Sequence, residues 1–224
     1  MKKKKLLILL ALVAVIFCFS VGITYASFSS KDSVDNLFMT GKVAHVIEEE
    51  FDPGGYKKEE DIPKIVKLRN DSNVATFMRI SIVPMWVTVD DSGKEIPWAG
   101  DTSNVIINYN TDFIGEMNSY SKDNYSEWYN HNAHKWVEDK TLNGNIHYFY
   151  YTKILMNEAS TSQIIDSVNY KIPESQEDRY EGKKLKIKVK SEIVLANKDA
   201  IDCAWSDLKD EKIKEMLLNL PKGE

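Results

Sequence analysis

The chain begins with a long apolar run and then changes to segments in which apolar and polar residues alternate. Residues 1–5 carry four lysines, and residues 6–19 are apolar without interruption. A basic start, an apolar stretch and small residues at a cleavage point are typical of a secretory signal peptide. Thr24 and Ala26 are small, which predicts cleavage between Ala26 and Ser27 and removal of residues 1–26. The alternative is an uncleaved membrane anchor, because a stretch of about eighteen apolar residues can cross a bilayer.

From residue 40 to residue 196, runs rich in Val, Ile, Tyr and Phe are separated by Asn, Asp, Gly and Ser. This pattern is typical of β-strands joined by turns. In residues 76–89, alternation places Phe77 and Arg79 on one face and Met78 and Ile80 on the other. Pro84 cannot donate to a ladder and predicts a bulge or an edge. Residues 90–93 predict a hairpin turn into residues 94–98. Further strands are predicted at 42–49, 63–69, 105–109, 145–155, 162–172 and 184–196.

The last of these segments has the clearest alternation. One face carries Leu185, Ile187 and Val189, and the other carries Lys184, Lys186, Lys188 and Lys190. This arrangement predicts a half-buried strand whose lysine face lies in water. A charged face also discourages association of strand edges, so the stripe need not be a binding site.

Helical patterns are fewer. Residues 206–220 predict a terminal helix that is capped by Ser206 and ends before Pro221. Residues 112–140 have no clean period, and we interpret them as a crossover with one short helix near residues 126–137. No linker or repeat divides the chain after the N-terminal segment 27–40. We therefore predict one domain over residues 41–224 with a crossover insertion at 110–140, mainly β, as a two-sheet β-sandwich with helical insertions and a C-terminal helix.

Charge and cysteine content narrow the possible partners. Without residues 1–26 the chain has 25 basic and 34 acidic residues, a formal charge of −9. Such an acidic balance disfavours a nucleic-acid partner. Cys18 is removed with the signal, so Cys203 has no intramolecular partner for a disulfide. It either packs as a small apolar residue or links two chains.

The sequence gives little indication of a catalytic site. His131 and His134 form an H-x-x-H pair and His147 follows, but no acidic residue lies between the first two and no second cysteine is available. A hydrolytic zinc site would need both a base and a third ligand. No nucleophile or phosphate-binding motif is found either. We predict no metal, no cofactor and no enzymatic activity.

Four aromatic residues in the crossover form the most distinctive cluster: Tyr125, Trp128, Tyr129 and Trp136. Tyr and Trp combine large apolar area with a polar group, which suits a protein interface or sugar stacking. The alternative is that they close the opening of the sandwich beneath the crossover.

Short motifs at both ends of the mature chain follow one another in a specific order. They are Thr24-Tyr25-Ala26-Ser27-Phe28, Asn36-Leu37-Phe38 and Gly41-Lys42-Val43; Glu49, Phe51 and Pro53-Gly54; Lys64, Val66, Leu68 and Asn70; Ala75 and Arg79; and Glu192, Ile193, Val194, Ala196 and Trp205. Together they resemble the TasA/camelysin family of exported biofilm-matrix proteins, most closely its clostridial BsaA branch. Residues 101–140 match no motif of that family. Ser27 stands where the family has alanine, and Pro63 precedes the strand of Lys64.

The resemblance implies a jelly-roll-like sandwich, exported from a Gram-positive bacterium, whose signal is cut by the dedicated signal peptidase SipW. It also implies self-assembly into extracellular fibres, in which residues after the cut complete the sheet of the next copy, with other matrix subunits or polysaccharide as further partners. The donor residues would be Phe28, Val34, Leu37 and Phe38. Phe28 and Val34 are six residues apart, which places them on one side of a strand. The alternatives are a secreted adhesin or carbohydrate-binding module and, less favoured without a zinc motif, a camelysin-like protease.

Overall fold

The computed structural model describes residues 44–51, 60–141 and 146–222. Contacts divide the chain into two compact units, Met1–Lys42 and Val43–Glu224. The predictions for the signal peptide, for the cleavage point and for the N-terminal segment 27–40 therefore lie outside the described residues.

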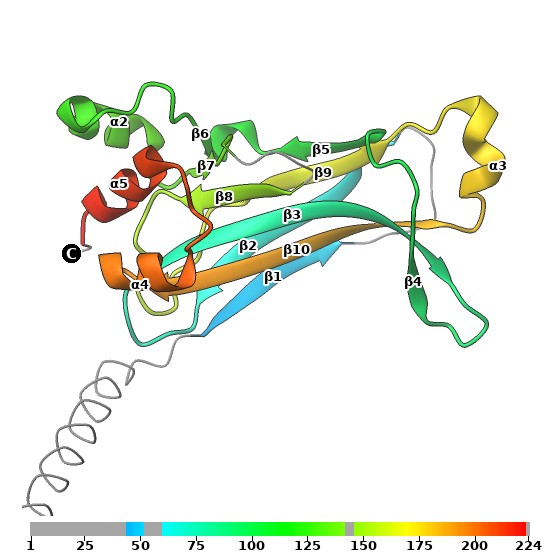
Figure 1. Ribbon diagram of the computed structural model, residues 1–224, viewed down its shortest axis with the longest axis horizontal. Helices are drawn as coiled ribbons and strands as arrows, with labels where there is room; N and C mark the ends of the chain where they lie inside the picture. The colour runs from blue at the N-terminus through cyan, green and yellow to red at the C-terminus, as the bar shows by residue number, and fades with distance from the viewer. Residues whose placement is uncertain (1–43, 52–59, 142–145, 223–224) are drawn as a thin grey trace, which may run out of the picture. The chain divides into compact units, whose positions relative to one another are not determined.

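The second unit is mainly β, with two sheets and a few helices (Figure 1). Its strands are β1 (His45–Phe51), β2 (Ile62–Asn70), β3 (Thr76–Val89), β4 (Glu95–Trp98), β5 (Val105–Tyr109), β6 (Ile114–Gly115), β7 (Trp136–Glu138), β8 (His147–Tyr151), β9 (Ile165–Tyr170) and β10 (Lys184–Leu195). Its α-helices are α2 (Tyr125–Asn132), α3 (Glu177–Tyr180), α4 (Lys198–Ala204) and α5 (Glu211–Asn219), and its 3-10 turns are Thr111–Phe113, Lys122–Asn124 and Glu174–Gln176.

The strands form two sheets. One has the order β1-β2-β9-β5, and the other has the order β10-β3-β8-β7-β6, with β4 paired to β3. All of the described pairs are antiparallel except β6 with β7. An apolar core joins the two sheets: Val66, Leu68 and Val168 from the first contact Ile80 and Phe149 from the second. This arrangement is consistent with the predicted β-sandwich.

The alternation predicted for residues 76–89 is confirmed. Met78 and Ile80 belong to the core that joins the two sheets, whereas Phe77 faces the opposite side of β3. The register of β3 with β10 continues without a break through Pro84, which is opposite Ile187. On its other edge, β3 pairs with β8 at residues 79–82 and with β4 at residues 86–89. Pro84 lies in the gap between these two described pairings, as expected of a local edge.

Short-range turn chemistry forms the β3–β4 hairpin. The Asp90 carboxylate accepts hydrogen bonds from the backbone N–H groups of Ser92 and Lys94, both at 2.9 Å. Gly93 has a φ of 82°, a left-handed conformation that glycine adopts without steric cost. The hairpin predicted at residues 90–93 is therefore confirmed.

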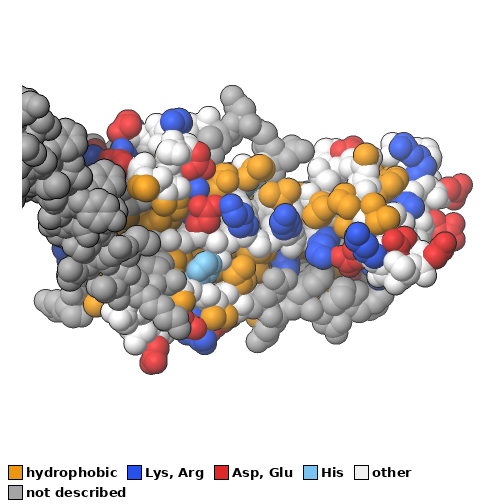
Figure 2. Space-filling model, turned by 60° about the horizontal axis from the view of Figure 1, so that its bottom comes forward, with side chains coloured by type: hydrophobic (Ala, Val, Ile, Leu, Met, Phe, Trp, Pro, Cys, Tyr) orange, Lys and Arg blue, Asp and Glu red, His pale blue; other side chains and the backbone are white. Residues whose placement is uncertain are grey.

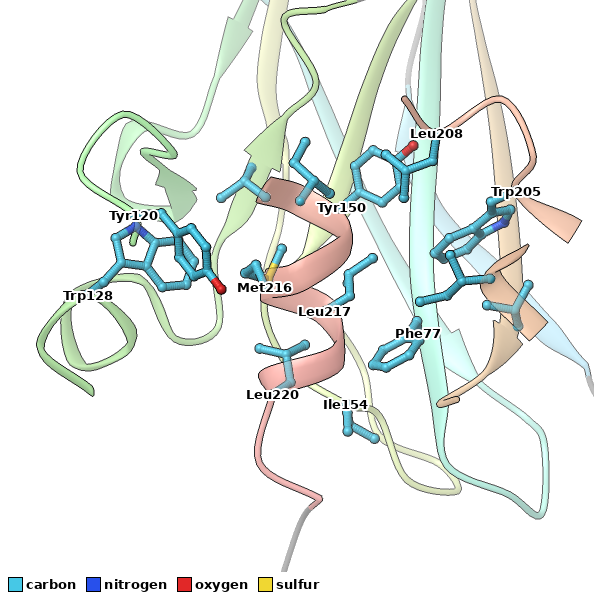
Figure 3. Packing of buried hydrophobic residues seen from close by; sticks show 14 residues of the cluster. Phe77, Tyr120, Trp128, Tyr150, Ile154, Trp205, Leu208, Met216, Leu217 and Leu220 are labelled. Carbon is cyan, nitrogen blue, oxygen red and sulfur yellow. The ribbon is translucent and has the colours of Figure 1, made fainter. Parts of the chain in front are cut away.

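A layer of helices covers the face of the larger sheet that carries Phe77. Along α5, Ile213, Met216, Leu217 and the capping residue Leu220 follow the i, i+3, i+4, i+7 spacing of one helix face, and all four are buried. Figure 3 shows this face of α5 turned toward Phe77 and Tyr150 of the sheet, with Trp205 beside them. Burying each of these large side chains stabilises the fold by about 1.5–3 kcal/mol relative to exposure.

The predicted terminal helix at residues 206–220 is wrong in its boundaries. Within that range the structure has only α5, which begins at Glu211, and a separate helix, α4, precedes it and ends at Ala204. The segment from Trp205 to Asp210 joins the two helices. Asp210 rather than Ser206 caps the second helix, because its carboxylate accepts from the backbone N–H groups of Lys212 and Ile213. Cys203 lies exposed on α4 and does not pack as a buried apolar residue.

The crossover at residues 110–140 also differs from the prediction. The helix ends at Asn132 rather than continuing to residue 137, and His134 then adopts a φ of 63°. This left-handed residue redirects the chain into β7, which pairs with β8. The crossover thus contributes two short strands to the larger sheet, so it is more than an insertion outside the sandwich.

Candidate strand-acceptor site

One end strand of the first sheet, β1, lies next to one end strand of the second, β10. Within the described residues, β1 pairs only with β2 and β10 pairs only with β3, so each of them keeps one unpaired edge. The two strands run side by side in Figure 1. Nε2 of His45 on β1 lies 2.5 Å from the Ser191 hydroxyl oxygen on β10, which links these edges. We call this side of the sandwich the β1–β10 side.

The core is less completely covered along the β1–β10 side than at its centre. Val66, Leu68 and Ile80 on inner strands are 0% exposed. By contrast, four inward-facing residues of β1 and β10 are only partly buried against the same core: Ile47, Leu185, Val189 and Ile193. Ile187, which lies between Leu185 and Val189 on the same face of β10, is buried. The sandwich therefore offers partly exposed apolar side chains between two unpaired backbone edges.

The outer face of β10 carries the predicted lysine stripe. Lys184, Lys186, Lys188 and Lys190 are exposed, whereas Ile187 is buried on the opposite face, so the predicted alternation is confirmed. Figure 2 brings this lower side of the molecule forward and shows Lys and Arg side chains in a row beside hydrophobic ones. The Lys186 ammonium lies 2.5 Å from Glu95 on β4, and its hydrogen bond holds the pKa of that carboxyl below its usual value.

A buried cation links β3 to β10. Arg79 on β3 has a side chain that is 4% exposed, and it lies 2.7 Å from Glu192 on β10 and 2.9 Å from Asp207. Its guanidinium also donates to the Tyr150 hydroxyl at 3.3 Å and lies over the Trp205 ring. Burial lowers the pKa of Arg79, but the hydrogen bonds to Asp207, Tyr150 and Glu192 outweigh burial and raise it.

An extended peptide is the ligand that this geometry suits. Unpaired strand edges present rows of N–H and C=O groups that another strand can pair with. In such β-augmentation, backbone hydrogen bonds supply affinity and pockets for alternate side chains supply specificity. The partly exposed Ile47 and Val189 would contact the inward-facing side chains of an added strand. The predicted donor residues Phe28, Val34, Leu37 and Phe38, and the predicted cleavage residues Ala26 and Ser27, lie outside the described residues.

The four aromatic residues of the crossover do not form one surface. Trp136 is 0% exposed in the core between the sheets, and its indole N–H donates to the Ser162 carbonyl at 3.0 Å. Trp128 is buried in the helical layer, and its indole N–H donates to the Glu116 carbonyl at 2.6 Å. Tyr125 and Tyr129 stack at 5.7 Å and stay partly exposed. Only these two tyrosines remain available to an external ligand, because both indoles are enclosed by the fold.

The histidines have ordinary partners. Nδ1 of His131 lies 2.9 Å from the Glu127 carbonyl oxygen, and Nδ1 of His147 lies 2.7 Å from Glu138. Burial lowers the pKa of His134, and the charge of Lys153 adds to this effect. Among the residues that the structure describes, no three His, Cys, Asp or Glu side chains gather as metal ligands would. Over the same residues, no helix is long and apolar enough to cross a membrane.

Two features of the structure were not predicted from the sequence. The first is the Arg79 cluster. Arg79, Glu192 and Trp205 appear in the short motifs of the resemblance, but nothing in the sequence predicted that they meet. The second is a group of aromatic rings from separate strands and a helix: Trp86, Trp98, Tyr170 and Tyr180. The residues of both clusters come from distant segments of the chain, so no sequence spacing predicts that they meet.

Comparisons with protein-family models, with curated proteins and with solved structures gave no match. The resemblance to exported matrix proteins therefore stays a prediction that rests on the short motifs in the sequence.

Proposed function

We propose that this protein is a secreted structural subunit that assembles head-to-tail into extracellular fibres of a biofilm matrix. In this proposal the sandwich is jelly-roll-like, and signal cleavage between Ala26 and Ser27 releases the following segment. That segment leaves its own domain and adds as a strand to the next copy at the β1–β10 side. The protein acts by assembly rather than by catalysis, outside a Gram-positive cell.

The observation that carries the proposal is the open β1–β10 side. Ile47 on β1 and Val189 on β10 pack against the core yet are only partly buried, and both strands keep an unpaired edge within the described part of the chain. An added strand would cover these side chains and pair one of the edges. Burying a phenylalanine such as Phe28 contributes about 2 kcal/mol, in addition to the ladder hydrogen bonds.

The symmetry of such a contact favours fibres. Donor and acceptor are different surfaces of the same chain, so the contact is heterologous. A heterologous contact that does not close into a ring propagates as a filament. Cleavage would control assembly, because the donor segment is tethered to the signal peptide until the bond after Ala26 is cut.

The competing adhesin hypothesis draws less support from the geometry. It needs the aromatic side chains of the crossover at the surface, whereas Trp128 and Trp136 are both buried with satisfied indole N–H groups. Their environment favours the role of closing the sandwich.

Electron microscopy tests the proposal directly. Purified protein that starts at Ser27 should form regular filaments, whereas a version with a blocked N-terminal extension should stay monomeric. A third sample lacking residues 27–34 should also fail to polymerise while keeping the same circular dichroism spectrum. Filaments from the deletion variant would contradict the donor-strand mechanism, and monomers in all samples would contradict the assembly function.

A further inference from the structure

A pocket of about 400 Å³ lies where α3 and the chain that follows it meet β3 and β9. Its walls are the aromatic side chains of Trp86, Tyr170 and Tyr180, and its lining also includes three carboxylates, those of Glu177, Asp178 and Glu181. The three rings are at most 7% exposed, whereas the three carboxylates are exposed. The pocket thus combines a fixed aromatic wall with an acidic rim.

The rings are held in place by contacts with one another and with Asp101, which is not part of the pocket lining. Trp86 packs edge-to-face against Tyr170 at 5.1 Å and against Tyr180 at 4.9 Å. The Trp86 indole N–H donates to the backbone carbonyl of Asp101 at 3.0 Å, and the Tyr180 hydroxyl accepts from the backbone N–H of Asp101 at the same distance. Both of these polar groups are thus engaged by the backbone of Asp101, a residue outside the pocket lining.

The charge of the pocket is negative. Among the described residues that line it, Lys183 is the single basic one, against three carboxylates. The Lys183 ammonium lies 5.4 Å from the centre of the Trp98 ring and 3.4 Å from the Thr88 hydroxyl. Trp98 packs on Tyr180 at 4.9 Å but is not part of the pocket lining. This aromatic group therefore already holds one ammonium on a neighbouring ring face.

We propose that this pocket binds an organic cation, through an alkylammonium group that sits against the rings and is balanced by the acidic rim. Aromatic rings attract cations through their negative faces, and desolvated sites strengthen this attraction. Carboxylates at the rim add opposite charge and accept hydrogen bonds from N–H donors. A neutral sugar would gain no charge interaction, and an anion would be repelled by the rim.

An alkylammonium group has two plausible sources, a free small cation and a lysine side chain of a protein. The exposed lysines of β10 on a second copy would belong to the latter source. Both sources carry an alkylammonium group, and they differ in the shape of the molecule around it. The proposal is independent of the proposed function, because the pocket and the β1–β10 side are tested by different ligands and different variants.

Nuclear magnetic resonance titration of the purified protein tests the site, with the indole N–H resonance of Trp86 as the reporter. Choline is the first probe, and the neutral 3,3-dimethylbutan-1-ol, which has the same shape, is the control. Choline should shift the resonance in a saturable way and the alcohol should bind about tenfold more weakly or not at all. Equal binding of the two would overturn the proposal, because the site would then select shape and not charge.

A triple variant separates the pocket from general surface charge. Glu177→Gln with Asp178→Asn and Glu181→Gln should weaken choline binding by about tenfold while leaving the amide spectrum of the core unchanged. The matched control removes three exposed carboxylates elsewhere, by Asp112→Asn, Glu127→Gln and Asp199→Asn, and should bind choline as the original protein does. Undiminished binding by the pocket variant, or an equal loss in the control, would overturn the site.

The source is decided by a second probe, N-acetyl-lysine methylamide. Tighter binding of this probe than of choline identifies a protein lysine as the natural ligand, and the reverse order identifies a free cation. Both results support the site provided that the pocket variant loses the binding. If neither cation shifts the reporter more than the neutral alcohol does, the pocket is not a cation site.

Discussion

Arg79 on β3 and Glu192 on β10 are directly paired residues of neighbouring strands, and their charged groups meet at 2.7 Å on the face covered by helices. The same guanidinium reaches Asp207, which lies in the turn between α4 and α5, at 2.9 Å. One buried cation therefore joins β3 and the end strand β10 of the larger sheet to the segment that connects the last two helices. This contact fixes where the helical layer sits on the sheet.

Replacing this cation should cost substantial stability. Arg79→Met keeps much of the side-chain volume but leaves Glu192 without its cationic partner on β3, and removal of one partner of a buried ion pair typically costs about 3 kcal/mol or more. We expect the free energy of unfolding to fall by about 3 kcal/mol, measured by urea denaturation. The free energy of unfolding of Arg79→Lys should lie between those of the original protein and of Arg79→Met. A lysine ammonium keeps the charge but cannot reproduce the planar fork of donors of the guanidinium.

The control for this measurement is Lys186→Met, which removes an exposed ion pair with Glu95 on the same sheet. Exposed pairs contribute little, so its denaturation midpoint should stay close to that of the original protein. A midpoint for Arg79→Met equal to that of Lys186→Met would show that Arg79 is not a structural anchor.

The same cluster predicts a dependence of stability on pH. Burial raises the pKa of Glu192, but hydrogen bonds from Lys190 and Arg79 outweigh burial and hold it below the ordinary value of 4.5. A carboxyl group with a lowered pKa in the folded state stabilises the fold above its unfolded pKa. That stabilisation is lost as the pH falls through the folded pKa.

We therefore expect the free energy of unfolding to decrease as the pH is lowered below 4.5, and Glu192→Gln should make this decrease shallower. Denaturation curves at several pH values measure both slopes. Identical slopes in the two proteins would assign the acid sensitivity to other carboxyl groups.

Two neighbouring tyrosines should respond oppositely to loss of the hydroxyl group. The Tyr125 hydroxyl is buried and has no hydrogen-bond partner among the described residues, and burial raises its pKa to about 12. The Tyr120 hydroxyl accepts from the Asn219 side chain at 3.2 Å. Because an unsatisfied buried group costs free energy, Tyr125→Phe should be neutral or stabilising by up to about 1 kcal/mol.

Tyr120→Phe should instead lose about 1 kcal/mol, since it removes a hydrogen bond and leaves the amide of Asn219 without it. Thermal denaturation of both variants under one set of conditions makes the comparison. A loss of stability in Tyr125→Phe would indicate that its hydroxyl has a partner after all.

Assembly at the β1–β10 side predicts a difference between adjacent positions on β1. Ile47 faces the core and is partly buried, whereas Val46 is 37% exposed on the other face of the strand. Ile47→Lys places a charge where an added strand would pack and should prevent filament formation, as seen by electron microscopy. Val46→Lys adds the same charge on the face of β1 that points away from the core, and it should leave filaments intact.

Circular dichroism of both variants verifies that each is folded. Filaments from a folded Ile47→Lys protein would exclude this side as the acceptor. Loss of filaments in both variants would mean that charge on β1, and not access to the open side, controls assembly.

Much of the sheet could be predicted because its strands alternate strictly. In residues 184–190 every second residue is a lysine. In residues 76–82 one face carries Met78, Ile80 and Ile82, whereas the other mixes Phe77 with the polar residues Arg79 and Ser81. Where strands are short, the period cannot be recognised. β6 has two residues and β7 has three, and both were missed within a crossover that was expected to contain one short helix and no strand.

The C-terminal helices show a second limit. A helix in this segment was predicted correctly, but Ser206 was predicted as its cap, whereas Asp210 caps it in the structure. The choice depends on Trp205 and Leu208, which are buried in the helical layer and hold the intervening turn against it. Sequence patterns within one segment do not contain that tertiary contact.

The candidate sites could be predicted least. The open side forms only because β1 and β10, from opposite ends of the chain, lie at the same side of the sandwich. The Arg79 cluster and the aromatic pocket likewise combine residues from distant segments. The expectation of a donor segment after the signal came from the resemblance to exported matrix proteins, and that resemblance named no acceptor residues.

The longest ladder among the described strands, between β3 and β10, also has a consequence for how the chain folds. It joins twelve pairs of residues that are about a hundred positions apart in sequence. During synthesis β3 is complete long before β10 exists, so its long apolar edge stays exposed until almost the whole chain has been made. Pairings of such high sequence separation form slowly. A chain released before β10 would present that edge to other copies and aggregate. The larger sheet is therefore complete only once the C-terminal third of the chain has been made.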